Sequence, residues 1–448
     1  MNLNQRRLLY ILFIIAFLII TPLISLYATG YKIGGGFRIQ KTGILILDTE
    51  PKGASISLNG KQLRRPLARF FSQTQSHITT PAKIKNLLPK EYNISLELPG
   101  HWSWQKKLVV KPGQSTYAED VVLFKNDIPG LILSGQYNNI ALSPDDKYLT
   151  ARENNGFTLI KLKNENIHIV ASTSAENEPV NYNWSPDNKH LIADNYLFDL
   201  NDPAKDQSLS SNINPEITKV KWQNNDTLIY KLNSSLQSYN INNKKIDIIK
   251  NNLVFDDFLV KNSNLFTISR DEQNSALSFH NFDNNELLSS FNLPKAEYGF
   301  KHESHNLLNI YDHAHQILYL IDPFSSFKRL RDTISNINDS VWIDNNSLLF
   351  ANDFEIWLYD ARSQNRTLLT RISKPIKKII WHPSNNYVIY ATENNINTIE
   401  LDKRDKFNIT RLLELNDING LVLDITGETL YFSARIGNQE GIYKLTIQ

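Results

Sequence analysis

The sequence predicts an all-β protein that begins with a single transmembrane helix. Three observations lead to this fold class: one long apolar run near the N-terminus, many short strand-like segments, and a turn motif that recurs about every 40 residues. Tyr, Phe and Trp number 19, 21 and 7, and together with frequent Ile and Thr they favour strands over helices. At 448 residues the chain is too long for one ordinary domain, so we expect several units or a repeat.

Charge and cysteine content exclude several classes of function. Lys and Arg together number 48 and Asp and Glu 46, so the chain lacks the basic excess that draws proteins onto nucleic acid. Nucleic acid is therefore not an expected partner. The chain contains no cysteine, which rules out disulfides, thiolate zinc sites, cysteine nucleophiles and iron–sulfur clusters.

The first feature along the chain is an apolar run from Leu8 to Leu26. Its length corresponds to roughly 29 Å of helix, which matches the hydrocarbon thickness of a bilayer. We therefore expect residues 1–30 to form an N-terminal transmembrane anchor with one span. A cleaved signal peptide is the alternative. Against it, the run is longer than the usual h-region, and a cut after Ala28 would place Leu26 at the minus-three position.

The residues that flank this span bear on its orientation. Arg6 and Arg7 abut the apolar run, whereas Lys32, Arg38 and Lys41 are spread along the other side, so the charge count alone does not decide. A large folded C-terminal portion is commonly translocated whatever its charge. We predict a single-pass protein of the cytoplasmic membrane with its N-terminus inside and its C-terminal domains outside.

Residues 31–40 and 41–125 form the next two expected segments. Gly34-Gly35-Gly36 predicts a flexible linker at 31–40. In 41–125 apolar residues alternate with polar ones, as at Ile94, Leu96 and Leu98, which places one face of each strand against a core. This pattern predicts a small antiparallel β-sandwich. Its strand-like segments are Ile44–Leu47, Ala54–Leu58, Tyr92–Leu98 and Lys107–Val110.

The segment 41–125 resembles the PEGA domain family. The sequence departs from the family pattern at Lys52, where the name-giving Glu would stand, and in an insertion from Lys61 to Thr80. The resemblance implies a surface-display module without catalytic residues. The matching residues are Pro51-Lys52-Gly53-Ala54, Ile56, Leu58, Asn59-Gly60, Thr80-Pro81-Ala82-Lys83-Ile84, Leu87, Tyr92, Ile94 and Gly100-His101-Trp102.

Two groups of residues in this domain are candidates for surface contact. The insertion is basic and aromatic, and Arg64, Arg65 and Arg69 could bind lipid headgroups or an acidic wall polymer. A long solvated hairpin loop is the plainer interpretation of the same residues. Trp102 and Trp104 lie next to a turn, and we expect them to be the first candidates for stacking on a glycan.

Residues 126–448 contain a repeat that is marked by the residue ending the first strand of each unit. A period near 40 with short strands in each unit is typical of a β-propeller. Eight such anchors predict eight blades, with seven as the alternative if the weak fourth or fifth unit is misread. The anchors are Leu142, Trp184, Trp222, Leu259, Phe300, Trp342, Trp381 and Leu423, and they are separated by 42, 38, 37, 41, 42, 39 and 42 residues.

The two ends of the repeat predict how the ring closes. The last unit ends after its third strand, Ile442 to Leu445, while Leu131 to Leu133 precedes the first anchor as an unassigned strand. We expect this N-terminal strand to complete the last blade. Stacking of neighbouring blades would then bury both faces of every sheet.

The repeat resembles the WD40-like, TolB-type propeller repeats. Their Trp-Ser-Pro-Asp-Gly consensus is matched at Trp184 to Asp187 and at Leu142 to Asp145, and partly at Trp381-His382-Pro383-Ser384. The resemblance implies a periplasmic or surface binding scaffold. In some members of the family the propeller is followed in the chain by a hydrolase domain. No hydrolase segment follows this repeat in the sequence.

Few residues suggest a reaction centre. Asp145 and Asp187 follow Pro in a turn, where a carboxylate accepts backbone hydrogen bonds. Trp222, Trp342 and Trp381 could form a sugar platform, but they occupy the repeat's own anchor position, which favours packing between blades. The spacing His313-x-His315 would put both imidazoles on one side of a strand, where they could ligate zinc, although solvated imidazoles explain it as well. The full histidine cluster is His302, His305, His313 and His315.

Together these patterns predict a non-catalytic, membrane-anchored envelope protein whose propeller binds or scaffolds a protein or an envelope polysaccharide. No cofactor and no metal site is predicted, because no nucleophile elbow, P-loop, His-Glu-x-x-His or EF-hand motif is present. The alternative is a propeller enzyme, such as a glycosidase, a lyase or a quinoprotein-like dehydrogenase. That alternative requires several charged side chains to converge at one end of the central channel.

Overall fold

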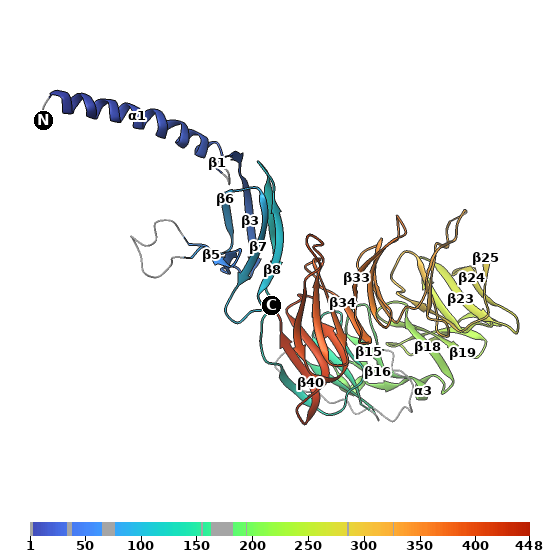
Figure 1. The fold of residues 1–448 in the computed structure, drawn as a ribbon. Helices are drawn as coiled ribbons and strands as arrows, with labels where there is room; N and C mark the ends of the chain where they lie inside the picture. The colour runs from blue at the N-terminus through green and yellow to red at the C-terminus, as the bar shows by residue number, and fades with distance from the viewer. Residues whose placement is uncertain are drawn as a thin grey trace. The chain divides into compact units, whose positions relative to one another are not determined.

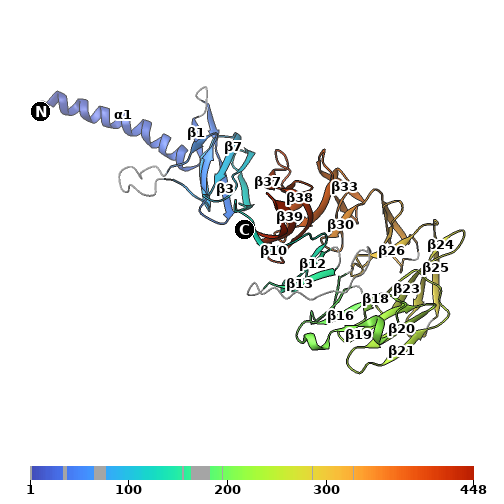
Figure 2. The same cartoon turned by 90° about the horizontal axis from the view of Figure 1, so that it is seen from below.

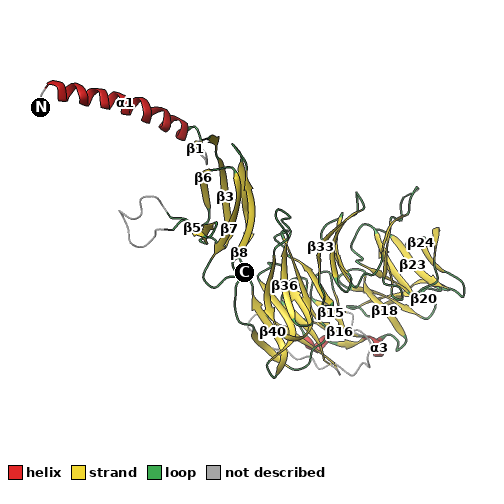
Figure 3. Cartoon of the chain, viewed as in Figure 1, coloured by secondary structure: helices red, strands yellow, loops and turns green. Residues whose placement is uncertain are grey.

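The computed structural model describes residues 3–33, 38–64, 77–153, 156–162, 182–193, 195–284, 286–325 and 327–448. The chain divides into two compact units, shown with the whole chain in Figure 1. The first unit comprises Met1–Ile128, Thr398–Leu412 and Thr446–Gln448, and the second comprises Pro129–Asn397 and Leu413–Leu445. Strands dominate both units apart from one long N-terminal helix (Figure 3).

Helix α1 (Leu3–Ala28) contains the predicted apolar run. Its segment Gln5–Ala28 has a mean hydropathy of 2.7 and is not covered by the other described residues. A helix that is apolar on every side is stable only when it is buried in protein or in lipid. The structure therefore confirms one apolar N-terminal helix that is long enough to serve as a membrane span or a signal anchor.

A short hairpin follows the helix. Strands β1 (Tyr31–Ile33) and β2 (Ile39–Lys41) pair antiparallel, so the described part of 31–40 is not an unstructured linker. Apolar and polar residues alternate in β1, which is typical of a strand. The Gly34-Gly35-Gly36 segment, on which that prediction rested, lies outside the described residues. Thr42 ties the hairpin to the helix, because its N–H and its hydroxyl both donate to the carbonyl of Gly30, at 2.8 and 2.7 Å.

Two small sheets form the rest of the N-terminal part of the first unit. Apolar side chains from both sheets form one core, which includes Leu45, Leu47, Ile56, Ile94 and Leu108. The sheets are β6-β3-β9 and β5-β4-β7-β8. Their strands are β3 (Gly43–Glu50), β4 (Ser55–Leu58), β5 (Lys61–Gln62), β6 (Ala82–Leu87), β7 (Lys90–Glu97), β8 (Trp104–Val110) and β9 (Ser115–Val122).

One strand pair corrects the prediction of an antiparallel domain. Strands β3 and β9 pair in parallel, because the chain leaves one sheet after β8 and enters the other at β9 in the direction of β3. The connection passes close to the start of β3, where Ile44 N–H donates to Gln114 O at 3.0 Å. A Cβ at Gly43 would lie 2.4 Å from Lys111 O, so this crossing requires glycine.

The second unit is a succession of antiparallel meander sheets, which follow one another in chain order (Figure 2). The first four are β11-β12-β13 (Ile140–Leu142, Tyr148–Glu153, Gly156–Lys161), β14-β15-β16-β17 (Tyr182–Trp184, His190–Ala193, Tyr196–Asp199, Gln207–Ser208), β18-β19-β20-β21 (Ile217–Trp222, Thr227–Leu232, Ser235–Asn240, Ile246–Lys250) and β22-β23-β24-β25 (Asp257–Lys261, Asn264–Arg270, Ser275–Asn281, Leu287–Leu293). Two short helices, η2 (Pro203–Lys205) and α3 (Leu209–Asn212), flank β17.

The remaining sheets bring the chain back to the beginning of the second unit. They are β26-β27-β28-β29 (Tyr298–Lys301, Leu308–Asp312, Ile317–Ile321, Leu330–Ile334), β30-β31-β32-β33 (Asp339–Trp342, Ser347–Ala351, Glu355–Asp360, Asn365–Arg371), β34-β35-β36-β37 (Ile376–Trp381, Tyr387–Thr392, Asn395–Glu400, Ile409–Glu414) and β10-β40-β39-β38 (Gly130–Ser134, Gln439–Thr446, Thr429–Ile436, Asn416–Leu423). Strand β10 pairs with β40, with Leu131 opposite Tyr443, which confirms the predicted pairing of the 131–133 strand with the last unit.

Neighbouring sheets bury each other's faces. Beginning with the sheet that contains β38, each sheet shares an apolar cluster with the next sheet in the series, as far as the sheet that contains β30. Contacts of β30 with β34 and of β34 with β38 complete the series. Sheets that each pack on the next, and the last on the first, form a β-propeller arrangement.

The recurring motif occupies the place predicted for it. Trp184, Trp222, Trp342 and Trp381 each end the first strand of a sheet. After Trp184 the hydroxyl of Ser185 donates to Asp187 at 2.7 Å and accepts from His190 N–H at 2.9 Å. The motif is therefore a turn with internal hydrogen bonds.

Candidate functional site

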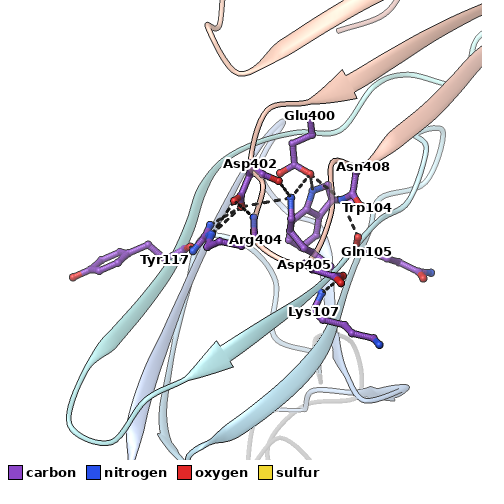
Figure 4. A network of polar contacts seen from close by, with 10 residues as sticks. Trp104, Gln105, Lys107, Tyr117, Glu400, Asp402, Arg404, Asp405 and Asn408 are labelled. Carbon is purple, nitrogen blue, oxygen red and sulfur yellow. Dashed lines mark hydrogen bonds and ion pairs between the residues drawn. The ribbon is translucent and has the colours of Figure 1, made fainter. Parts of the chain in front are cut away.

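A buried polar cluster lies between strand β8 and the segment 400–408 of the first unit (Figure 4). Glu400 is at its centre. One carboxylate oxygen, Oε2, accepts from Trp104 Nε1 at 3.0 Å, from Lys106 Nζ at 3.0 Å and from Asn408 Nδ2 at 2.8 Å. Lys106 also donates to Asp402 O at 2.7 Å. We call Trp104, Lys106, Glu400, Asp402, Arg404 and Asn408 the Glu400 cluster.

The buried charges of the Glu400 cluster compensate one another in place of water. Lys106 is 1% exposed and Glu400 6% exposed, so neither charge has water to compensate it. Arg404 forks onto Asp402, with Nη2 2.7 Å from Oδ2, and its Nη1 donates to Tyr117 O at 2.7 Å. Burial alone would raise the pKa of Asp402, but hydrogen bonds from Arg404 and the charge of Lys106 hold that pKa below its usual value.

The same segment closes the free edge of β8. Asp405 accepts from Lys107 N–H at 3.1 Å, and Asn408 donates to Gln105 O at 2.9 Å. Exposed strand edges invite pairing with other chains, so side chains that occupy their backbone groups protect the fold. With its polar atoms engaged in this way, the Glu400 cluster acts as a structural connection and offers no free nucleophile or base.

The predicted surface residues do not form one site. Trp104 is 6% exposed and belongs to the Glu400 cluster, so its ring is not available to stack on a sugar. Trp102 is half-buried, and its Nε1 is buried without a hydrogen-bond partner. Arg64 is exposed and lies beyond β5, at the edge of the sheet opposite β8. Arg65 and Arg69 lie outside the described residues.

Lys106 carries a signal in the sequence that could have revealed this cluster. It lies two residues after Trp104 and two before Leu108, so strand alternation places it on the inward face with them. A lysine at an inward position implies a buried carboxylate partner. The identity of that partner, Glu400, could not follow from local pattern, because it lies 294 residues away in the sequence.

The histidine cluster is divided among separate structural roles. His302 bonds with Ser340 Oγ at 2.9 Å, and His305 stacks on Trp342 with ring centroids 3.6 Å apart. His313 and His315 lie between β27 and β28 in a turn closed by Asp312, not on a strand as the spacing suggested. Asp312 accepts backbone N–H groups there, which favours a turn over an extended strand. Among the described residues, no group of three or more His, Asp or Glu side chains could hold a metal ion.

Burial keeps His302 neutral. It lowers the pKa of this imidazole to about 4, and the neighbouring positive charge of Lys301 acts in the same direction. His305 shows the same effect, since burial lowers its pKa as well. These two imidazoles are therefore packing residues at neutral pH.

Charged side chains on the first strands link one sheet to the next. Asp257 is 5% exposed and accepts from Phe300 N–H, in the following sheet, at 3.0 Å. Asp339 repeats this contact with Ile379 N–H at 3.0 Å. Lys221 of β18 donates to Phe258 O in the following sheet at 2.6 Å, and also to Glu303 Oε1, which lies just after β26, at 2.6 Å. These residues were not predicted from the sequence, because nothing in the local pattern of their strands distinguishes them from solvent-facing charged residues.

A groove of about 280 Å³ lies at one end of the second unit. Starts of first strands, ends of second strands, the start of β40 and the segment between β10 and β11 form it, so it is at the end opposite the recurring turns. Both charge signs line it, including an ion pair between Asp417 and Arg435. Burial, together with the charge of Glu153, raises the pKa of the adjoining Tyr137 to about 12, which keeps this phenol protonated. The other polar lining residues are Gln136, Asn138, Lys377, Glu393, Asn419, Ser433 and Glu440.

Comparisons with known proteins identify similar folds only. No family model matches the sequence, and no curated protein matches it. Among solved structures, the C-terminal WD40 domain of Sif2 is 13% identical, with a TM-score of 0.47, over 71% of this chain and 98% of that one. The Dos1 propeller is 14% identical, with a TM-score of 0.49, over 72% and 96%. A chain of a mitotic checkpoint complex is 12% identical, with a TM-score of 0.41, over 69% and 90%.

Proposed function

We propose that this protein is a non-catalytic, membrane-anchored binding module outside the cytoplasmic membrane. Residues 1–30 would anchor it with the N-terminus inside. Residues 41–125 would form a PEGA-like surface module, and residues 126–448 an eight-bladed propeller that binds a partner protein. Eight successive meander sheets among the described residues 130–446 support this blade number.

The groove beside Tyr137 carries the proposal of a binding function. It lies at the end of the sheets away from the recurring turns that follow the first strands. Lysine, arginine and carboxylate side chains surround it together, and this mixed charge suits a protein surface better than a polyanionic polysaccharide. An envelope polysaccharide is the other outcome of the test.

Single cysteines provide the test, because the chain has none of its own. A photo-crosslinker attached to Glu393→Cys, at the groove, should capture a defined protein in intact cells. The same crosslinker at Asn345→Cys, in an exposed recurring turn, serves as the matched control. A second substitution in the groove, Lys377→Glu, should abolish the adduct if the groove itself makes the contact.

Two results would argue against the proposal. Equal capture at both positions would indicate non-specific proximity. Adducts that are sensitive to periodate and resistant to protease would identify a polysaccharide as the ligand instead.

A further inference from the structure

We propose that the β1–β2 hairpin is a phospholipid-binding element, which lies in the headgroup layer of the membrane with Ile33 and Ile39 against the acyl chains. This inference rests on the proposed membrane anchor. It goes beyond the anchor because it assigns lipid contact to folded residues outside the helix.

The short connection between helix and hairpin limits how far the hairpin can lie from the bilayer. Only Thr29 and Gly30 separate Ala28, the last residue of α1, from Tyr31. Both continue the helix end, since Thr29 N–H donates to Ser25 O at 3.0 Å and Gly30 N–H to Tyr27 O at 3.2 Å. A few residues reach roughly 10 Å, and each headgroup layer is about 5–8 Å thick. If α1 spans the bilayer to its end, β1 therefore begins in or at the headgroup layer.

The hairpin presents a face next to the helix end on which three of the four residues are apolar or aromatic and the fourth is a lysine. Its register places Ile33 opposite Ile39 and Tyr31 opposite Lys41, so strand alternation puts these four on one face. Ile33 is 50% exposed and Ile39 56% exposed, although both are large apolar residues. Together with Leu23, Leu26, Tyr27, Tyr31 and Lys32 they line a groove of about 280 Å³.

The apolar surface of α1 continues into this groove. Leu23, Leu26 and Tyr27 belong to the helix and line the groove from one side, while Ile33 and Ile39 line it from the other. A bilayer that covers α1 would therefore reach the hairpin without interruption. This continuity identifies lipid, not a second protein, as the occupant of the groove.

Charged and aromatic residues around the hairpin match an anionic membrane surface. Lys32, Arg38 and Lys41 are exposed, and residues 29–42 contain no Asp or Glu. Exposed basic residues beside a span are attracted to anionic headgroups, and tyrosines are favoured at the membrane interface. Tyr27, at 58% exposure, and Tyr31, at 37%, occupy that level.

Three single-cysteine variants of the full chain test the proposal. Each carries an environment-sensitive NBD label and is reconstituted into vesicles of phosphatidylcholine and phosphatidylglycerol, with or without doxyl-labelled lipid. Ile33→Cys reports on the hairpin and Phe13→Cys on the span. Ile128→Cys is the water-exposed control, because it is 92% exposed and follows β9, whose end pairs with the end of β3 remote from the hairpin.

The expected result is lipid quenching at positions 13 and 33 that is several-fold stronger than at position 128. Iodide should quench in the reverse order. In vesicles of phosphatidylcholine alone, quenching at position 33 should weaken while quenching at position 13 should not change.

The two possible failures are distinguishable. Absence of lipid quenching at position 13 would overturn the anchor and with it the proposed function. Strong quenching at position 13, combined with iodide quenching at position 33 equal to that at position 128, would overturn the hairpin proposal alone. A Lys32→Glu/Arg38→Glu variant that kept its full lipid quenching in the mixed vesicles would disprove the part assigned to charge.

Discussion

Lys106 is only 1% exposed. A lysine buried to this degree is stable only when a neighbouring negative charge neutralises it. Glu400 does so and also accepts from Trp104 and Asn408. Replacing both members of such a pair by apolar residues can be harmless, whereas loss of one leaves an uncompensated charge. The stability of the Glu400 cluster therefore depends on the carboxylate of Glu400.

Substitution Glu400→Ala should lower the free energy of unfolding by about 3 kcal/mol, because it removes the nearer carboxylate from the buried Lys106 ammonium and leaves it only Asp402, whose Oδ2 is 3.5 Å away. Urea unfolding followed by tryptophan fluorescence measures this, and Trp104 lies inside the cluster as a reporter. Lys107→Ala, on the exposed face of the same strand, should change stability by no more than about 0.5 kcal/mol. Similar small losses for both variants would show that the Glu400 pair is not a stabilising contact.

His302 should make stability depend on pH. Its pKa in the folded protein, about 4, is below the ordinary value of 6.5, so the unfolded chain takes up the proton first. The contribution is complete above about pH 6.5 and declines as the pH falls toward 4. His302→Asn should remove about 2 kcal/mol of the loss measured between pH 7.5 and 5. Asn suits this site because the backbone φ of His302 is 52°, and Asn tolerates a positive φ.

The control for that prediction is His315→Asn, at an exposed turn. Urea midpoints at the two pH values should fall as steeply in this variant as in the unmodified protein. If His302→Asn also followed the unmodified curve, burial of the imidazole would not be the cause of the acid sensitivity.

At the scale of elements, the sequence pattern predicted those features that interactions between neighbouring residues determine. The turn after Trp184 could be predicted because Ser185 and Asp187 close it with their own hydrogen bonds. The hydrogen bond from Trp104 to Glu400 could not, since the two residues are 296 positions apart in the sequence. The parallel pairing of β3 with β9 also escaped prediction, because a change of sheet leaves no periodic signal.

Closure of the second unit through β10 and β40 is an element-scale property that one glycine can test. A Cβ at Gly441 would lie 2.5 Å from Leu133 O, so Gly441→Ala should push the strands apart and destabilise the protein by about 1–3 kcal/mol. Gly130→Ala is the matched control in the same strand pair, since its nearest neighbour, Lys444 Cγ, is 3.8 Å away. Thermal unfolding and limited proteolysis should distinguish them. An equal response of both variants would mean that close packing at Gly441 does not hold β10.

At the scale of the whole molecule, α1 is either a retained membrane anchor or a cleaved signal peptide, and the two alternatives predict different mature proteins. A retained anchor keeps the full mass of 51.6 kDa and resists extraction by carbonate, whereas a cleaved signal peptide removes the helix and releases the rest. Intact-mass measurement of the purified protein separates these outcomes. Because the chain contains no cysteine, its orientation in the membrane can also be tested, by introducing single cysteines.

Membrane orientation can be measured with single cysteines on the two sides of α1. In intact spheroplasts an impermeant maleimide should label Glu393→Cys at once, because we place the propeller outside, and should label Gln5→Cys only after permeabilisation. The Asn345→Cys protein, with its cysteine in an exposed turn, controls for local accessibility and should behave like Glu393→Cys. The opposite labelling order would place the propeller in the cytoplasm. The arginines at positions 6 and 7 would then lie outside, against the tendency of basic residues next to a span to remain inside.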